Sequence, residues 1–188
     1  NFYALSSYYL GSFFSPLVYF FNVQSMPDAV YLITLLKFGA IGLSAYISLH
    51  GIFSKTPRCL VLTLSTSFAL MSFAISQIEI KTWLDVFILA PLILYGFKKL
   101  IYNEGEVLYF ISLTSLFIQN YYFGFMMSIF LILWYLTQLS WNIKKIGKRF
   151  FHFVIVSLLS VITSLVMLYP TFLDLRTHGE SFSKVDSI

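Results

Sequence analysis

The lysine and arginine residues of this chain gather in every second polar break between its apolar runs. Eight of the twelve lie in three short segments, at residues 54–58, 98–106 and 141–149. Short cytoplasmic loops of multispanning membrane proteins carry such an excess of positive charge, whereas the loops on the other side do not. The composition agrees, because 59% of the residues are hydrophobic and only 11% are charged, against about 25% charged residues in soluble domains. The sequence therefore predicts an integral membrane protein.

The apolar runs have the length of transmembrane helices. A helix needs about 20 residues to cross the hydrocarbon core, and four runs supply them: residues 29–53, 59–78, 83–101 and 150–169. A further run, at residues 107–140, is too long for one span and short for two. A break near Asn120 resolves this, since it returns the basic clusters on both sides of the run to the cytoplasm. We therefore expect an all-α, polytopic transmembrane helix bundle of about six spans, with both ends of the chain outside the cytoplasm.

Three regions follow from this topology. Residues 1–28 are rich in aromatic side chains and interrupted by Pro16, which favours short helices in the outer membrane interface, one of them beginning near this proline. Residues 29–170 form the six-helix transmembrane region. Residues 171–188 turn polar and are expected to begin an external loop or domain. Because the chain opens with Asn1 and shows no cleavable signal, we expect it to be part of a longer protein.

One lysine lies inside a predicted span. Lys37 follows the start of the first span by eight residues, which places it about 12 Å below the outer end. Intramembrane lysines are costly and often functional, and one that faces a cavity can hold a lipid-linked phosphate. The alternative is that the long side chain snorkels to the outer interface. We expect Lys37 to face the bundle interior or an outward cavity.

A carboxylate stands at the outer mouth of the third span. Asp85 follows Trp83 by two positions, and a carboxylate there can act as a general base toward a sugar or polymer hydroxyl. The same residue has the capping-box spacing from Thr82, in which it would only satisfy the start of the helix. The sequence leaves the catalytic and the capping interpretations open.

The expected break in the long run carries an amide and two phenols. These belong to Asn120, Tyr121 and Tyr122. The helix before the break is only about 20 Å long, so the turn is expected below the outer surface, where irregular backbone is tolerated if it is buried in protein or faces a wet cavity. Together with Trp83, these residues are candidates for binding a sugar ring. A plain interfacial hairpin within an aromatic belt is the alternative.

Several classes of function lack their sequence signals. No nucleotide-binding loop, nucleophile elbow or His/Cys metal cluster occurs, and we predict no metal and no cofactor. Cys59 is the single cysteine and is expected to be inert. The net charge of +4 does not indicate nucleic-acid binding, because the basic residues form no continuous stripe. The partner that the pattern indicates is the lipid bilayer.

Several segments, taken in order, resemble the YfhO family of bacterial multispanning membrane proteins. Each motif alone is weak, but their order and spacing cover nearly the whole chain. The matching segments are NFYA at 1–4, YYLGS at 8–12, LLKFG at 35–39, WLD at 83–85, LAPL at 89–92, QNYYFG at 119–124 and LYPT at 168–171.

The resemblance implies a GT-C-like architecture, in which a membrane helix bundle transfers a sugar from a polyprenyl-phosphate donor to an acceptor outside the cell. For YfhO-type proteins the implied acceptor is a cell-wall polymer such as teichoic or lipoteichoic acid. Such enzymes carry an essential acidic residue in the first external loop, a region expected to precede Asn1. The resemblance therefore leaves Asp85 a supporting role, and it implies a location in the bacterial cell membrane.

Two further classes of function remain open beside the enzyme. A permease or transporter subunit predicts a polar pathway that continues to the cytoplasmic side, and a non-catalytic assembly protein predicts no connected polar cavity. The glycosyltransferase interpretation predicts an outward cavity that joins Lys37, Asp85 and Asn120. The ionisable residues within the spans lean toward the outer side, which argues against a transporter.

Overall fold

Every regular element in the described part of the chain is a helix. The computed structural model describes residues 12–141 and 149–185. The elements are the 3-10 helices η2 (Ser15–Phe20) and η3 (Val23–Ser25) and the α-helices α2 (Met26–Ile52), α3 (Arg58–Ala69), α4 (Ser72–Ser76), α5 (Lys81–Tyr102), α6 (Val107–Gln119), α7 (Tyr121–Trp141) and α9 (Phe150–Val185). The predicted all-α bundle is confirmed. The helix expected near Pro16 is also present, as η2.

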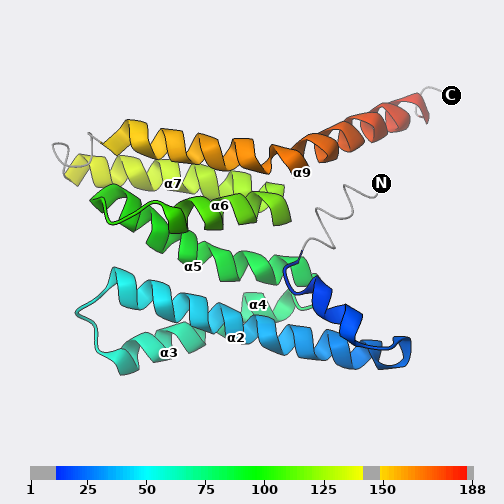
Figure 1. Cartoon of the computed structure of the whole chain (residues 1–188), viewed down its shortest axis with the longest axis horizontal. Helices are drawn as coiled ribbons and strands as arrows, with labels where there is room; N and C mark the ends of the chain where they lie inside the picture. The colour runs from blue at the N-terminus through cyan, green and yellow to red at the C-terminus, as the bar shows by residue number, and fades with distance from the viewer. Residues whose placement is uncertain (1–11, 142–148, 186–188) are drawn as a thin grey trace.

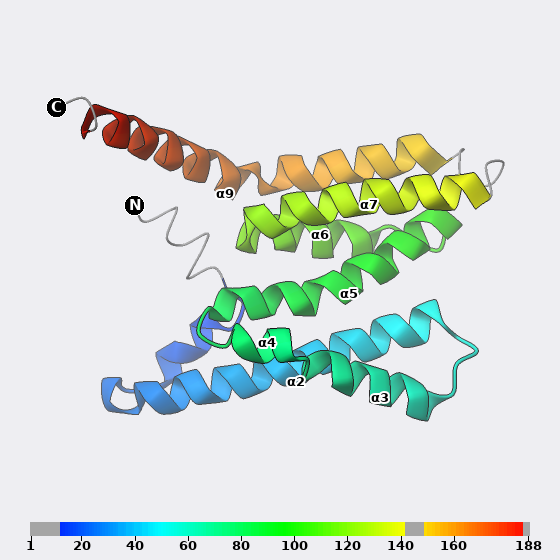
Figure 2. The ribbon, with the colours of Figure 1, turned by 180° about the vertical axis from the view of Figure 1, so that it is seen from behind.

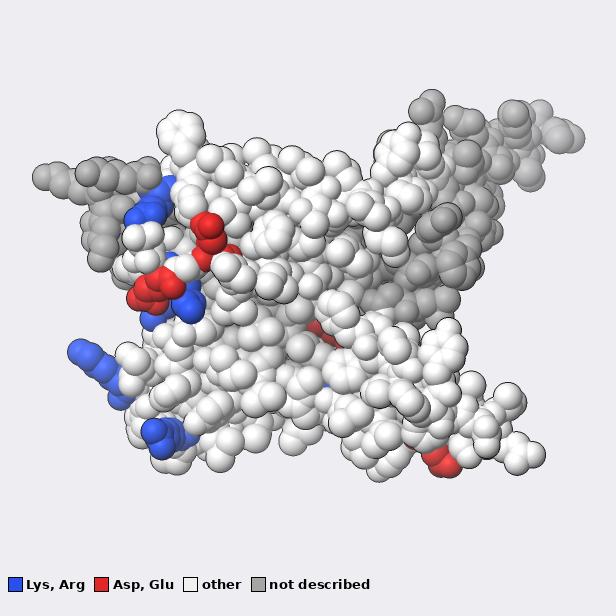
Figure 3. All heavy atoms as spheres, viewed as in Figure 1, with Lys and Arg blue, Asp and Glu red and all other residues white. Residues whose placement is uncertain are grey.

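Helix α5 lies in the middle of the bundle. It packs against α2 on one side and against α6 on the other, while α3 packs on α2 and α9 packs on α6 (Figure 1). The view from behind shows the same order, with α7 beside α6 and α9 (Figure 2). The loops α2–α3 and α5–α6 lie at one end of the bundle, together with the end of α7 and the start of α9. Lys and Arg side chains gather at this end (Figure 3), which we call the basic end.

Four helical segments of the described chain are long and apolar enough to cross a membrane. They are Val23–Ile52, Arg58–Ser76, Tyr121–Gln138 and Phe150–Pro170. Helix α5 has 22 residues, and thus spans about 33 Å, but it carries Asp85, Lys98 and Lys99. Helix α6 has 13 residues and is about 20 Å long. Four of the six predicted spans thus correspond to segments that could cross a membrane by length and composition. The other two lie in α5 and α6, and the predicted break at Asn120 separates α6 from α7.

Two boundaries differ from the sequence-based expectation. The second predicted span is broken between α3 and α4, where Met71 has an extended backbone (φ −62°, ψ 144°). The hydroxyls of Thr63 and Thr66 in the preceding turns donate to main-chain carbonyls, and such hydroxyl bonds loosen a helix. Helix α9 continues past Pro170 to Val185, with a change of direction in that region (Figure 1). The external location of residues 171–188 stays a prediction.

The core is built around α5. One buried cluster joins α5 to α6, α7 and α9 through large side chains such as Phe97, Tyr109 and Phe153, and a smaller one joins it to α2, α3 and α4. The contact with α6 is close at Gly96, where an added Cβ would lie 2.6 Å from the backbone N of Tyr109. The Tyr109 hydroxyl in turn shares a hydrogen bond of 2.8 Å with Ser157 of α9.

A second lysine of α5 fixes the end of α2. The Lys98 ammonium donates to the main-chain carbonyls of Gly51 (3.1 Å) and Ile52 (2.8 Å). These carbonyls belong to the last turn of α2, which has no helical donors left for them, so a cation there satisfies acceptors and favours the helix dipole. Lys98 therefore has a structural role at the basic end.

Candidate functional site

Lys37 and Asp85 form a buried ion pair between α2 and α5. The Lys37 ammonium donates to Asp85 Oδ2 at 2.9 Å. The exposed fractions of the two residues are 0% and 1%. An isolated ammonium within a bilayer would be costly, and a buried charge persists when it is paired. The prediction that Lys37 faces the bundle interior is confirmed, and the snorkelling alternative is wrong.

The helical period explains why Lys37 points inward. It belongs to the buried stripe of α2 that recurs every three or four residues, with Ile33 before it and Ile41 and Ser44 after it. Such a spacing keeps side chains on one face of an α-helix. Asp85 lies in the second turn of α5, between the buried residues Leu84 and Val86. The packing of α2 on α5 then brings the two charges together.

The capping interpretation of Asp85 is wrong. Helix α5 begins at Lys81, its N-cap is Ile80, and no side chain caps it. Thr82 is therefore already inside the helix and does not stand at the N-cap position that a capping box requires. Tertiary packing against Lys37 determines the environment of Asp85, and a local sequence pattern contains no information about that partner.

The segment before α2 covers the ion pair. The Lys37 ammonium lies 5.7 Å from the ring centroid of Phe14, a distance at which a cation is attracted to an aromatic face. The hydroxyl of Ser12 lies beside the Asp85 carboxylate, although Oδ1 accepts no hydrogen bond of good geometry. The pair is thus covered by this segment, through Phe14 over the ammonium and Ser12 beside the carboxylate.

The break between α6 and α7 is organised by Asn120. This residue has an extended backbone (φ −152°, ψ 97°), and its side-chain Oδ1 accepts a hydrogen bond of 3.2 Å from the backbone N–H of Phe123. Its main-chain carbonyl accepts from Gly124 at 2.9 Å. Asn120 is therefore the N-cap of α7. Asn120 and the preceding Gln119 are each only 1% exposed.

Aromatic rings join this break to the start of α5. The rings of Trp83 and Phe123 meet edge to face, with their centroids 5.3 Å apart, and Tyr122 meets Phe123 at 5.6 Å. Tyr121 is half-buried and Tyr122 is 55% exposed. The structure therefore groups the candidate residues Trp83, Asn120, Tyr121 and Tyr122 at one place.

The two groups of candidate residues lie on different faces of α5. Trp83 and Asp85 are two positions apart, which is about 200° around a helix. Trp83 contacts the start of α7, whereas Asp85 contacts α2. The structure thus brings Lys37 to Asp85 and Trp83 to the Asn120 break. It does not put both groups on one face, so it does not join Lys37, Asp85 and Asn120 as the predicted outward cavity requires.

The whole chain resembles one known protein family. The family model described as bacterial membrane protein YfhO matches residues 1–188, the whole length of the chain. This chain belongs to the YfhO family. No curated protein sequence and no solved structure matches it. The family and the apolar helices together identify a bacterial membrane protein.

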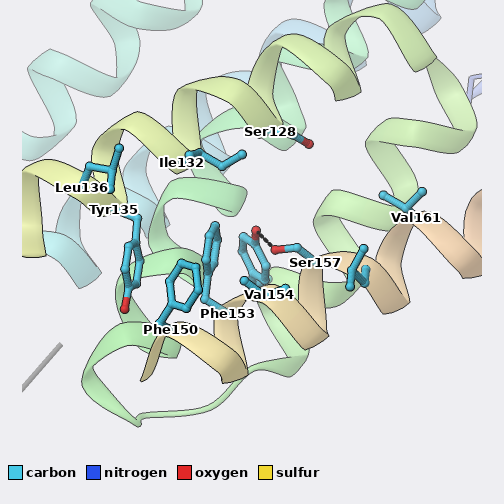
Figure 4. A pocket seen from close by; sticks show the side chains of 11 residues that line it. Ser128, Ile132, Tyr135, Leu136, Phe150, Phe153, Val154, Ser157 and Val161 are labelled. Carbon is cyan, nitrogen blue, oxygen red and sulfur yellow. Dashed lines mark hydrogen bonds between the residues drawn. The ribbon is translucent and has the colours of Figure 1, made fainter. Parts of the chain in front are cut away.

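The described part of this YfhO-family chain has an apolar cavity of about 290 Å³ between α6, α7 and α9. Aromatic rings of Tyr135, Phe150 and Phe153 line it together with Ser157 (Figure 4). Tyr109, which shares a hydrogen bond with Ser157, also lines the cavity. The hydroxyl of Ser128 donates to its own helix. Because these polar atoms are already bonded, the cavity suits a hydrocarbon chain and not a polar ligand.

Two other cavities occur in the described residues. One of about 550 Å³ lies between α2 and α3, where Gly39, Gly42, Ser65 and Ala69 keep the helices slim. Small residues at such positions allow close helix approach in lipid. The other, of about 280 Å³, lies at the basic end beside Lys98 and Trp134. None of these three cavities is lined by a candidate site residue, and sequence patterns gave no signal for them.

Among the described residues, no three His, Cys, Asp or Glu side chains come together as metal ligands would. Cys59 is exposed and not in a disulfide. His152 contacts Glu106 across the start of α9 and the loop before α6, and both are partly exposed. The contact of His152 with Glu106 therefore joins α9 to the loop before α6 at the surface of the basic end.

Proposed function

We propose that this chain is part of a membrane glycosyltransferase that moves a sugar from a polyprenyl-phosphate donor to a cell-wall polymer outside the cell. The observation that carries the proposal is the buried ion pair of Lys37 and Asp85 in a YfhO-family bundle. Intramembrane ionisable residues are rare, and they mark functional sites by default. Among the described residues, Asp85 Oδ1 accepts no hydrogen bond of good geometry.

The orientation of the chain is part of the proposal. The basic end faces the cytoplasm, by the positive-inside rule, and the ends of the chain lie outside. Asp85 is the fifth residue of α5, about 6 Å from the helix start and therefore in the outer half of the bundle. A substrate that arrives from outside meets this half first.

The ion pair suggests how the protein would bind the sugar donor and activate the hydroxyl of the acceptor polymer. A lipid-linked phosphate that reaches Lys37 offers its ammonium a second anionic acceptor. Sharing the ammonium with phosphate weakens its hold on Asp85, and the freed carboxylate can accept a hydrogen bond or a proton from an acceptor hydroxyl. Asp85 has a supporting role here, and Trp83, Tyr121 and Tyr122 offer aromatic faces to a sugar ring.

Donor binding and sugar transfer by the intact protein test the proposal. Lys37→Met alone would leave a buried unpaired carboxylate, so the informative variant is Lys37→Met with Asp85→Leu, which removes both charges and preserves packing. We expect this double variant to fold and to bind a polyprenyl-phosphate sugar at least tenfold more weakly. Lys98→Met, which removes a lysine at the basic end, is the matched control and should keep donor binding.

Asp85→Asn measures how much the carboxylate itself contributes to the rate of sugar transfer. A supporting role predicts a loss of transfer of less than about tenfold, whereas a main general base supplies roughly 100-fold to 10,000-fold. A loss in the larger range, with folding and donor binding intact, would make Asp85 the main base. Absence of any sugar transfer by the intact protein, or unchanged donor binding by the double variant, would overturn the proposal.

A further inference from the structure

The buried side-chain amides of Gln119 and Asn120 contain three polar atoms without a hydrogen-bond partner among the described residues. Both residues are 1% exposed. Within residues 12–141 and 149–185, Gln119 Nε2, Gln119 Oε1 and Asn120 Nδ2 have no hydrogen-bond partner. Buried amides are almost always hydrogen-bonded, because water cannot replace the missing contact. Three such atoms on two consecutive residues therefore indicate a group that binds here.

The position of the amides defines what they can bind. Asn120 Oδ1 accepts from the first turn of α7, so the Nδ2 of the same amide lies beside this helix start. The N–H groups of Phe123 and Gly124 at this helix start are already bonded to Asn120, so the unpaired donor groups here are Asn120 Nδ2 and Gln119 Nε2. Gln119 contributes one donor and one acceptor. The site thus has more donors than acceptors but contains both.

This mixture of donors and an acceptor matches hydroxyl groups. A hydroxyl both donates and accepts, whereas a phosphate oxygen only accepts and would leave Gln119 Oε1 without a donor. Aromatic rings lie at the same break, with Phe123 between Trp83 and Tyr122 in an edge-to-face chain. Aromatic faces and directed amides together are suited to a sugar ring, whose faces are apolar and whose rim is hydroxylated.

We propose that Gln119 and Asn120 form the subsite that binds the hydroxyls of the transferred sugar, with Gln119 as the residue that discriminates between sugars. This inference rests on the proposed function. Access requires movement, because the amides are buried. The half-buried Tyr121 and the exposed Tyr122 are the side chains of the adjoining turn that can turn aside.

Gln119→Met in the intact protein tests the subsite. The substitution keeps the length of the side chain and removes its unpaired polar atoms. The probes are farnesyl phosphates that carry glucose, galactose or N-acetylglucosamine, and farnesyl phosphate without a sugar. We expect the variant to melt at a higher temperature than the wild type without ligand, because two unpaired buried atoms are gone. It should bind the best sugar probe about tenfold more weakly and farnesyl phosphate unchanged.

Gln138→Met is the matched control, since Gln138 lies near the other end of α7 beside the cavity at the basic end. It should leave the binding of all probes unchanged. If Gln119→Met binds the sugar probes as the wild type does, the amides hold only buried water, and the subsite is wrong while the proposed function stands. If the wild type prefers no sugar probe over farnesyl phosphate and transfers no sugar, both proposals fail.

Discussion

Separate and combined replacement of Lys37 and Asp85 should give opposite effects on stability. The two groups are 2.9 Å apart and their side chains are only 1% and 2% exposed. At this distance the attraction is about 6 kcal/mol with an effective dielectric constant of about 20, and it is offset by a desolvation cost of several kcal/mol for each ion. Removal of one partner loses the attraction and leaves the other charge buried.

We therefore expect Lys37→Met and Asp85→Leu each to lower the free energy of unfolding by about 3 to 5 kcal/mol. The double variant should lie within about 1 kcal/mol of the wild type or above it, since burial of two charges is no longer required. Thermal or denaturant unfolding in detergent micelles measures all four proteins as a double-mutant cycle. Losses below about 1 kcal/mol for both single variants, or a double variant that loses the sum of the two, would refute the reasoning.

Three other predictions concern packing and topology. Gly96→Ala should lower the free energy of unfolding by about 2 to 3 kcal/mol, because the added Cβ meets the backbone of α6. Gly39→Ala, whose Cβ would have nothing within 4 Å, should be neutral or stabilising. An equal effect of both substitutions on unfolding would count against the close approach of α5 and α6 at Gly96. Ser157→Ala removes the hydrogen bond between α6 and α9 and should cost about 1 kcal/mol. Cysteines placed at Lys55 and at Tyr122 should react with an impermeant reagent from opposite sides of the membrane; labelling from one side would contradict the proposed orientation.

The sequence predicted the helices well because their signals are local. Charge in the flanking loops requires a break near Asn120, and α6 indeed ends at Gln119. The inward direction of Lys37 follows from the cost of a charge in lipid. The partner of this lysine could not be predicted in the same way. Asp85 is 48 residues away, and its local spacing from Thr82 favoured a cap that the structure does not contain.

Other features also depend on tertiary contacts. The hydroxyl bonds in α3 are visible only once the helix is built, so the break at Met71 was not expected. The sequence singled out Asn120, but it gave no reason to choose Gln119, because an amide at the end of a helix is ordinary until its partners are known. The separation of the two candidate groups by α5 likewise comes from the direction in which Trp83 and Asp85 point.

The two lysine contacts between α2 and α5 have a mechanical consequence. Lys37, near the middle of α2, bonds to Asp85 near the start of α5, and Lys98 near the end of α5 bonds to the last carbonyls of α2. Asp85 and Lys98 are thirteen residues apart on α5, or about 20 Å. Two helices bonded to each other at two distant points resist both sliding and rotation relative to each other. If the bundle changes conformation during a reaction cycle, α2 and α5 should therefore move as one rigid body, and the breaks at Met71 and Asn120 should act as the hinges.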